Sequence, residues 1–182
     1  LIKMTNYYLS YLKEIKKNLE NIDYTLVEKL EKKILEIKKN KSKIIFFGNG
    51  GSAAISKHFA IDVLKNLKVR TLTFDHVQIT CFSNDYGHKN WMKKSLEFNY
   101  DKKDLVIFTS SSGNSINHIR AAQYCKKKKI FSVSFTGFNK NKLSKITNYS
   151  FIVNSKNYNI IENVHSVWFL MIIDRLSRKL IL

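Results

Sequence analysis

The sequence lacks proline altogether and has only two cysteines and six glycines among its 182 residues. Cys81 and Cys125 lie far apart in otherwise apolar or helical segments, so they form neither a CxxC pair nor a disulfide framework. No uninterrupted apolar run reaches the roughly 18 residues that cross a membrane, and no charged start followed by an apolar segment resembles a secretion signal. These absences predict a cytoplasmic protein with no membrane partner.

Positive charge is abundant but spread along the chain. The formal net charge is +18 and the sequence pI is about 9.8. The densest lysine runs, 38–41 and 126–129, fall at the ends of helical patterns, where cations complement the helix dipole. The bias toward lysine and asparagine, together with the missing proline, indicates a compositional habit of the source. Because no recognition helix or aromatic platform accompanies the charge, we expect no nucleic-acid partner.

Strands and helices alternate after residue 40, which is typical of a parallel sheet covered on both faces. The strands are predicted at 43–48, 69–74, 104–109, 129–135 and 149–153. The helices of this part are predicted at 53–66, 76–83, 87–98, 115–127, 140–146 and 158–180. The last helix is apolar nearly all round, so we expect it to be buried inside the fold or against another subunit.

Residues 1–40 are predicted to form a pair of amphipathic helices. Their apolar residues recur at helical spacing, and the break near 21–25 leaves Asn21 or Asp23 to cap the second helix. We therefore interpret 1–182 as a single domain, in which the helical pair at 1–40 serves oligomerisation and 41–182 forms an α/β core.

Two glycine and serine segments each follow a predicted strand and precede a predicted helix. They are GNGGS at 48–52 and SSSGNS at 110–115, where Ser115 is placed to cap the next helix. Glycine lets the backbone approach a ligand, and N–H groups at a helix start favour negative charge. The pair therefore indicates a phosphorylated ligand with a polyol body; the alternative for the second segment is a polar turn with a serine-capped helix. Neither segment is a Walker loop or a dinucleotide fingerprint.

Polar residues elsewhere could carry chemistry. His58 and Asp62 are four apart on a predicted helix and share a face, as a base with its orienting partner, as two metal ligands or as a surface pair. Glu162 begins an apolar helix, where an unpaired buried charge is costly, so it belongs either to a functional face or to an exposed first turn. The segment 84–87 is of turn type and could bind sugar hydroxyls or simply make the turn.

Five motifs occur in order: GNGGSAA at 48–54, HFA at 58–60, SNDYG at 83–87, SSSGNS at 110–115 and ENVH at 162–165. Together they resemble the sugar isomerase (SIS) domain and, within it, the phosphoheptose isomerases, which convert sedoheptulose 7-phosphate to a heptose phosphate for cell-surface polysaccharide. The resemblance covers nearly the whole chain. It implies a three-layer α-β-α fold with a five-stranded parallel sheet of flavodoxin-like type, a homotetramer and active sites between subunits.

The resemblance also assigns roles to residues. Catalysis falls to Asp62, where the family has glutamate, together with His58, Glu162 and His165; Glu162 stands where the family has glutamine. Leu170 occupies the position of the family's second acid-base histidine. The implied substrate-binding and phosphate-binding residues are Asn49, Gly50, Gly51, Ser52, Asn84, Asp85, Ser110, Ser111, Ser112 and Ser115.

Leu170 leaves two functions open, because leucine can neither accept nor donate the proton that aldose–ketose isomerisation moves. The first is a sugar-phosphate isomerase that makes surface-glycan precursors with a rearranged pair of Asp62 and His58. The second is a non-catalytic SIS module that binds a phosphosugar or a protein partner for regulation. We expect no cofactor, although His58, Asp62 and Glu162 could hold a divalent metal such as zinc.

Overall fold

A computed structural model of the chain describes residues 2–181. The helices of the amino-terminal half are α1 (Ile2–Glu20), α2 (Tyr24–Lys39), α3 (Gly50–Leu67), α4 (His76–Tyr86) and α5 (Trp91–Asn99). They are followed by α6 (Ile116–Lys128), a 3-10 turn η1 (Leu143–Lys145) and α7 (Tyr158–Ile181). The strands are β1 (Lys43–Gly48), β2 (Arg70–Leu72), β3 (Leu105–Ser110), β4 (Phe131–Gly137) and β5 (Tyr149–Val153).

All five strands are parallel and form one sheet in the order β2-β1-β3-β4-β5. β1 and β3 are buried along almost their whole length, as expected of strands covered on both faces. From β1 the chain moves to β2 on one side, and from β3 it moves to β4 on the other. This divergence lies between β1 and β3, where open α/β sheets usually bind ligands.

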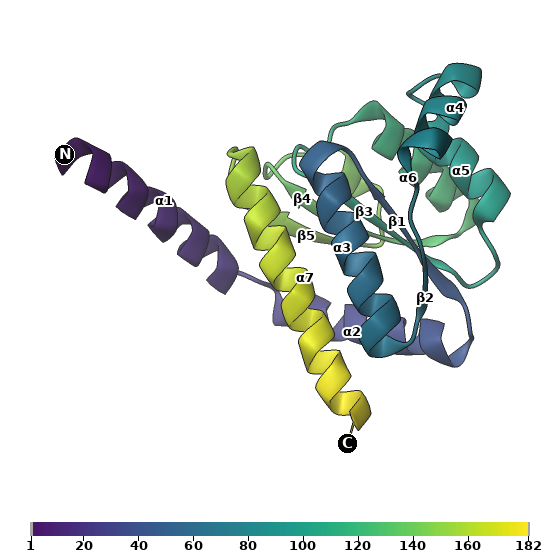
Figure 1. Cartoon of the computed structure of the whole chain (residues 1–182), viewed down its shortest axis with the longest axis horizontal. Coiled ribbons are helices and arrows are strands. Elements are labelled where there is room, and N and C mark those ends of the chain that lie inside the picture. Colours follow the sequence, from purple (N-terminus) through teal and green to yellow (C-terminus); the bar gives the residue numbers. More distant parts are fainter. Residues whose placement is uncertain (1, 182) are drawn as a thin grey trace.

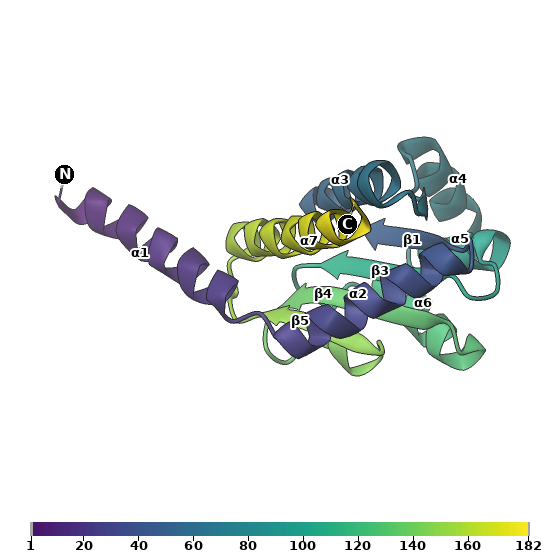
Figure 2. The same cartoon turned by 90° about the horizontal axis from the view of Figure 1, so that it is seen from below.

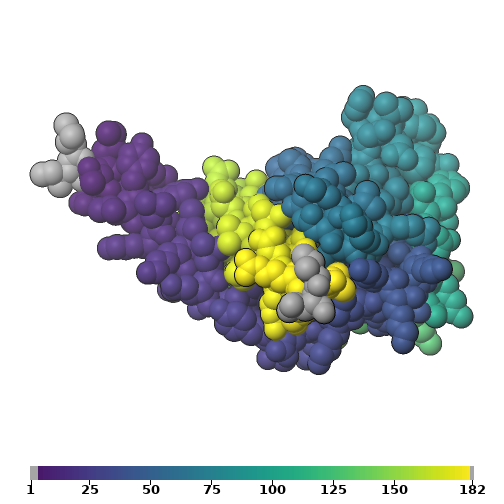
Figure 3. Space-filling view, turned by 60° about the horizontal axis from the view of Figure 1, so that its bottom comes forward, coloured from purple at the N-terminus to yellow at the C-terminus, as the bar shows by residue number. Residues whose placement is uncertain are grey.

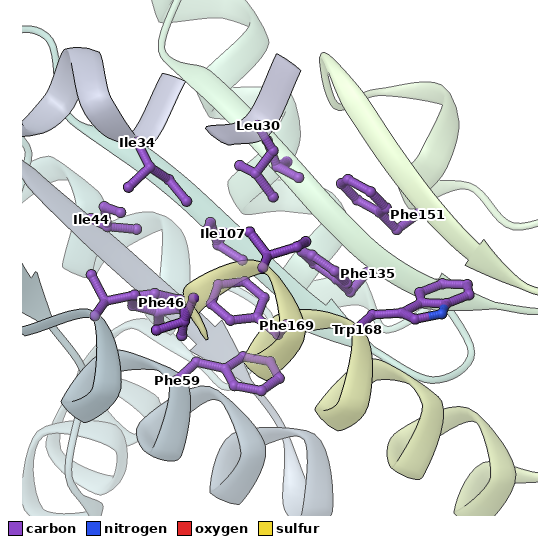
Figure 4. Close-up of a cluster of buried hydrophobic side chains, with 14 of the residues drawn as sticks. Leu30, Ile34, Ile44, Phe46, Phe59, Ile107, Phe135, Phe151, Trp168 and Phe169 are labelled. Carbon is purple, nitrogen blue, oxygen red and sulfur yellow. The ribbon is translucent and has the colours of Figure 1, made fainter. Parts of the chain in front are cut away.

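Helices cover both faces of the sheet, which confirms the predicted three-layer arrangement. Figure 2 shows α3 and α7 side by side above the strands and α6 below them. On the first face, side chains from α2, α3 and α7 pack on the sheet, and the Phe59 and Phe169 rings stack with their centroids 3.9 Å apart (Figure 4). On the second face, Trp91, Met92 and Leu96 of α5 pack with α6 and the strands.

The first helix does not pack against the second as a simple pair. α1 extends from the body as an arm (Figures 1 and 3), and only its carboxyl-terminal part is fastened. Trp168 Nε1 donates to the Leu19 carbonyl at 3.0 Å, and the Ser155 hydroxyl donates to Glu14 at 2.6 Å. Asp23, one of the two predicted caps, accepts the backbone N–H of Leu26 and begins α2.

Several predicted boundaries are wrong. The segment 84–87 is a turn only at Gly87, because α4 continues through Tyr86. α3 begins at Gly50 rather than near residue 53, so the GNGGS segment is largely the first turn of a helix. β2 covers only Arg70–Leu72, and the predicted helix at 140–146 is the short η1 turn. Among residues 2–181, no helix is long and apolar enough to cross a membrane.

The two faces of α7 differ. Val164, Trp168 and Ile172 are buried against the sheet, as predicted for this helix. Val167 and Met171 are exposed, and so are Ile61 and Leu64 on α3, which lies beside α7. The described chain therefore leaves an apolar surface open over these two helices.

Candidate functional site

The two glycine and serine segments meet at the carboxyl ends of β1 and β3. Gly48, at the end of β1, lies opposite Thr109 of β3. A cavity of about 250 Å³ opens here, at the divergence point of the sheet. Its lining residues are Asn49, Gly50, Gly51, Ser52, Ser110, Ser111, Ser112, Ser115, Tyr158 and Glu162. Eight of the ten predicted binding residues thus come together, and we call this the serine cavity.

Two helices begin at the serine cavity, and neither start is capped by a side chain. Asn49 and Ser115 occupy the N-cap positions of α3 and α6, but neither side chain bonds to its own helix. Apart from the His118 N–H, which donates to Asn117 Oδ1 at 3.1 Å, their first N–H groups are therefore free of a capping side chain, and the helix dipoles favour negative charge at these ends. Gly50 has a φ of +51°, a backbone conformation that favours glycine and that turns the chain into α3.

The side chain of Asn49 is held by α6 instead of capping α3. Its Nδ2 donates to Asn117 Oδ1 at 3.2 Å, and Asn117 Nδ2 donates to Asn49 Oδ1 at 3.0 Å. Asn117 is 1% exposed, and the neighbouring His118 is fully buried. Burial lowers the pKa of His118 to about 4, so the ring is neutral at pH 7. This pair of amides ties the loop after β1 to the helix after β3.

Sequence reasoning missed Asn117, His118 and Tyr158. The sequence gives a weak signal for the first two, because Asn117 and His118 are polar residues in the first turn of a predicted helix that follows a candidate loop, whereas their burial is known only from the structure. Buried polar groups require partners, and a partner for Asn117 within the loop was available in Asn49. Tyr158 reaches the cavity only through the placement of α7, which no local pattern reveals.

Glu162 joins the two segments from the first turns of α7. The Ser52 and Ser111 hydroxyls each donate to its Oε1 at 3.2 Å, and these two hydroxyls lie 3.3 Å apart. Glu162 is the one charged residue among the cavity's lining residues. The cavity in which we expect an anion to bind therefore already contains a carboxylate of its own chain.

His58 and Asp62 contact each other as predicted, but they do not line the serine cavity. His58 Nε2 lies 3.4 Å from Asp62 Oδ2, and their side chains are 56% and 22% exposed. Both share a face of α3 with Gly51, which contacts Glu162. At 1.5 Å per residue, His58 and Asp62 lie about 10 Å and about 16 Å along α3 from Gly51. The pair therefore lies two to three turns from the serine cavity, on the side of α3 that continues from it.

Leu170 lies at the level of this pair. Because the rings of Phe59 and Phe169 stack, their sequence neighbours His58 and Leu170 occupy the same level of two adjacent helices. Leu170 is partly buried and packs against the core. The position that the resemblance gives to an acid-base histidine thus carries an apolar side chain at about the level of His58.

The remaining predicted residues lie outside the serine cavity. Asn84 and Asp85 are exposed at the end of α4, where Asn84 Nδ2 donates to Asp85 Oδ1 at 3.1 Å. His165 is fully buried beside Phe135, and its Nε2 donates to the Thr136 carbonyl at 3.1 Å. Burial lowers the pKa of His165 to about 4. The structure thus places His165 in the core, where it does not line the cavity.

The three proposed metal ligands do not form a site in this chain. Among residues 2–181, no three His, Cys, Asp or Glu side chains come close enough together to hold a metal ion. His58 contacts Asp62, whereas Glu162 accepts hydrogen bonds from Ser52 and Ser111. The donor set within one chain therefore does not fit a divalent cation, and we derive no chemical step from one.

Comparison with known proteins places these features in a family context. Residues 7–137 match the model of the SIS domain. The chain is 35% identical to a phosphoheptose isomerase of Aneurinibacillus thermoaerophilus over 149 residues, which cover 78% of this chain and 75% of the relative. It is 28% identical to a phosphoheptose isomerase of Helicobacter pylori over 178 residues, covering 94% and 92% of the two chains. The fold is similar to that of phosphoheptose isomerase from Neisseria gonorrhoeae, with a TM-score of 0.87, 22% identity and 97% of both chains covered.

Proposed function

Because this chain belongs to the SIS-domain family and, within it, to the phosphoheptose isomerases, we propose that it is a sugar-phosphate aldose–ketose isomerase. The observation that carries the proposal is the serine cavity with its two helix starts that lack side-chain caps. Hydroxyl groups and free N–H groups at helix starts are the donors that bind a phosphate ester. We propose that the substrate is a ketose phosphate of the sedoheptulose 7-phosphate type, used for surface-glycan precursors.

Aldose–ketose isomerisation is an internal redox change. A proton leaves the carbon beside the carbonyl, and a proton returns to the former carbonyl carbon, while a second proton moves between the two oxygens. The electrons stay within the substrate, so the balance of the reaction needs no redox cofactor, and we propose that none is bound. What the protein must supply is a base, an acid and a fixed position for the sugar.

We propose that Asp62, oriented by His58, is the base. Their contact at 3.4 Å supports a shared role, and the side chain of Asp62 is more shielded from solvent than that of His58. A phosphate held at Ser111 and Ser112 would leave the sugar to extend along α3 toward this pair. His165, fully buried and bonded to the Thr136 carbonyl, is proposed to position α7 rather than to touch the substrate.

We propose that the active site is completed between subunits of a homotetramer. Apolar side chains on the projecting arm α1 are exposed, and so are those on the outer surface of α3 and α7. Contiguous exposed apolar surface is typical of protein interfaces. The second surface carries Ile61 beside Asp62, so a neighbouring subunit seated there would cover the base. Asn84 and Asp85, exposed on α4, are proposed to contribute in that assembly.

We propose a cytoplasmic location for the protein. Neither Cys81, which is exposed, nor Cys125, which is buried, is paired, and free thiols persist in a reducing compartment. Burial raises the pKa of the Cys125 thiol to about 12, so this cysteine is inert.

Leu170 favours a second candidate function, a phosphosugar-binding SIS module without turnover. Loss of one member of an acid-base pair costs about 10²–10⁴-fold in rate. Such a module would keep the serine cavity and use ligand binding to signal to a partner.

The deciding experiment is incubation of the purified protein with sedoheptulose 7-phosphate and other ketose phosphates, with aldose formation followed over time. We expect the wild type to turn over and Asp62→Ala to lose turnover. We expect Ser111→Ala combined with Ser112→Ala to weaken sugar-phosphate binding at least about tenfold, since hydrogen bonds to a charged group are worth roughly 1.5–3 kcal/mol. Ser10→Ala, an exposed change on α1, is the matched control. Thermal stabilisation by sugar phosphates without turnover would favour the binding module, and unchanged affinity in the double serine variant would contradict the phosphate site.

A further inference from the structure

We infer that Glu162 is an internal anion that occupies the serine cavity of the free protein, so that it selects phosphosugars over inorganic phosphate. The inference rests on the proposed function, because it concerns the same cavity. It names the group that a ligand must displace and the chemical class of ligand able to do so.

Glu162 accepts hydrogen bonds from two serine hydroxyls of the serine cavity. Ser52 and Ser111 come from different segments, yet both hydroxyls donate to the same carboxylate oxygen at 3.2 Å. Ser52 is 3% exposed and Ser111 is 4% exposed, so water has little access to replace this acceptor. The two hydroxyls that face a bound anion are therefore already committed to a carboxylate.

The cavity wall at Gly51 leaves space for the Glu162 carboxylate. A Cβ atom added at Gly51 would lie 2.3 Å from Glu162 Oε2 and 2.9 Å from its Cδ. A side-chain carbon there would overlap the carboxylate where it now lies, so glycine at position 51 leaves the space that the carboxylate fills. The carboxylate is seated against the first turn of α3, at the helix end whose dipole favours negative charge.

The charge of Glu162 is not offset by the other residues that line the cavity. The residues that line the cavity include no lysine, arginine or histidine, so no cationic side chain among them offsets Glu162. Two anions a few ångströms apart repel each other strongly where water is largely excluded. A phosphate group can use the two serine hydroxyls only after the carboxylate has moved away from them.

The consequence is a preference among phosphorylated ligands. When Glu162 moves away from the two serines, it loses two hydrogen bonds and needs new donors. The hydroxyl groups of a sugar phosphate can supply such donors beside the phosphate. Inorganic phosphate, as a dianion, offers at most one donor, and its charge remains next to the carboxylate. Glu162 therefore penalises the bare anion more than the phosphosugar.

The test is Glu162→Gln, with the dissociation constants of inorganic phosphate and of sedoheptulose 7-phosphate measured by calorimetry. The amide oxygen of glutamine still accepts from both serines, so the fold is retained, and the melting temperature without ligand checks this. We expect inorganic phosphate to bind at least about tenfold more tightly to the variant, with a smaller gain for the phosphosugar. The control is Glu97→Gln, which removes the same charge from the solvent side of α5, where Glu97 pairs with Lys94.

Affinity for inorganic phosphate that stays within twofold of the control, weakens, or is undetectable at millimolar concentration in Glu162→Gln overturns the inference. An equal gain for both ligands overturns the selectivity. The experiment separates failure of this inference from failure of the isomerase proposal. If Glu162→Gln tightens phosphate as expected but neither protein interconverts sugar phosphates, the inference stands and the isomerase assignment fails; if the wild type turns over and Glu162→Gln changes nothing, the reverse holds.

Discussion

Two side chains on α7 stand where the resemblance gives other residue types, glutamine at Glu162 and histidine at Leu170. Glu162 places a carboxylate among serine hydroxyls, and Leu170, two turns further along, places an apolar group at the level of His58. Neither change disturbs the core, because Glu162 lies at the cavity and Leu170 is only partly buried. The chemistry of the site can therefore change while the fold does not.

The first prediction concerns the missing acid-base partner. Leu170→His restores an imidazole at the level of His58, so we expect kcat for ketose-phosphate isomerisation to rise at least about tenfold, within the range that general acid-base catalysis contributes. The measurement is steady-state kinetics with sedoheptulose 7-phosphate. Leu170→Asn is the control, because it adds polarity without a group that titrates near neutral pH. Equal rates in the two variants would show that position 170 does not act as an acid or base.

The starts of α3 and α6 set the geometry of the serine cavity. α3 and α6 begin beside each other because β1 and β3 are neighbours, and the Asn49–Asn117 amide pair keeps the two starts together. The arm α1 projects from the body (Figure 3), and several of its apolar side chains, Leu9 and Leu12 among them, are exposed.

The second prediction concerns this arm. Leu9 and Leu12 are exposed and three residues apart, so they share a face. If the proposed tetramer forms through this face, we expect Leu9→Asp combined with Leu12→Asp to shift it to smaller species, because charged groups at an apolar interface lose hydration without gaining partners. Light scattering after gel filtration measures the mass. Ser10→Asp combined with Lys17→Asp adds acidic residues to another face of the same helix and should leave the mass unchanged; a wild-type mass of one subunit would contradict the proposed tetramer.

At the scale of the whole molecule, two buried histidines link stability to pH. His118 and His165 are fully buried in different parts of the chain, and burial lowers the pKa of each to about 4 from an ordinary value of 6.5. The unfolded chain therefore binds more protons than the native protein between pH 6.5 and 4, so the free energy of unfolding falls as pH falls through this window. The effect is up to about 3 kcal/mol for each ring.

The third prediction follows from this linkage. We expect these two histidines to contribute almost no pH dependence to the free energy of unfolding above pH 7. From pH 6.5 toward pH 4, the free energy of unfolding, measured by urea denaturation, should decline steadily. His165→Gln, whose amide can still donate to the Thr136 carbonyl, should make the decline shallower. His76→Gln, an exposed change at the start of α4, should leave the slope as it is. Parallel slopes in all three proteins would exclude His165 as a source of the effect.

Local patterns predicted most of the fold. The strand at 43–48 was predicted with the bounds it has, and the serine segment after β3 was recognised, because buried strands and the loops after them have distinctive composition. The end of α4 was predicted as a turn, since Asn84 and Asp85 are turn residues by propensity. The exposed last turn of a helix tolerates such residues, and the sequence offers no signal that separates the two cases.

Eight of the ten predicted binding residues share one cavity because the order of parallel strands brings their loops to one edge of the sheet. The amino-acid sequence by itself determined the strand and helix types, the family and the serine cavity, since these depend on residue type and near neighbours. Only the tertiary structure decided that Glu162 contacts Ser52 and Ser111, that Asn117 holds Asn49, and that His165 lies in the core. Those outcomes depend on how α6 and α7 pack against the sheet, and packing joins residues whose separation in sequence carries no local signal.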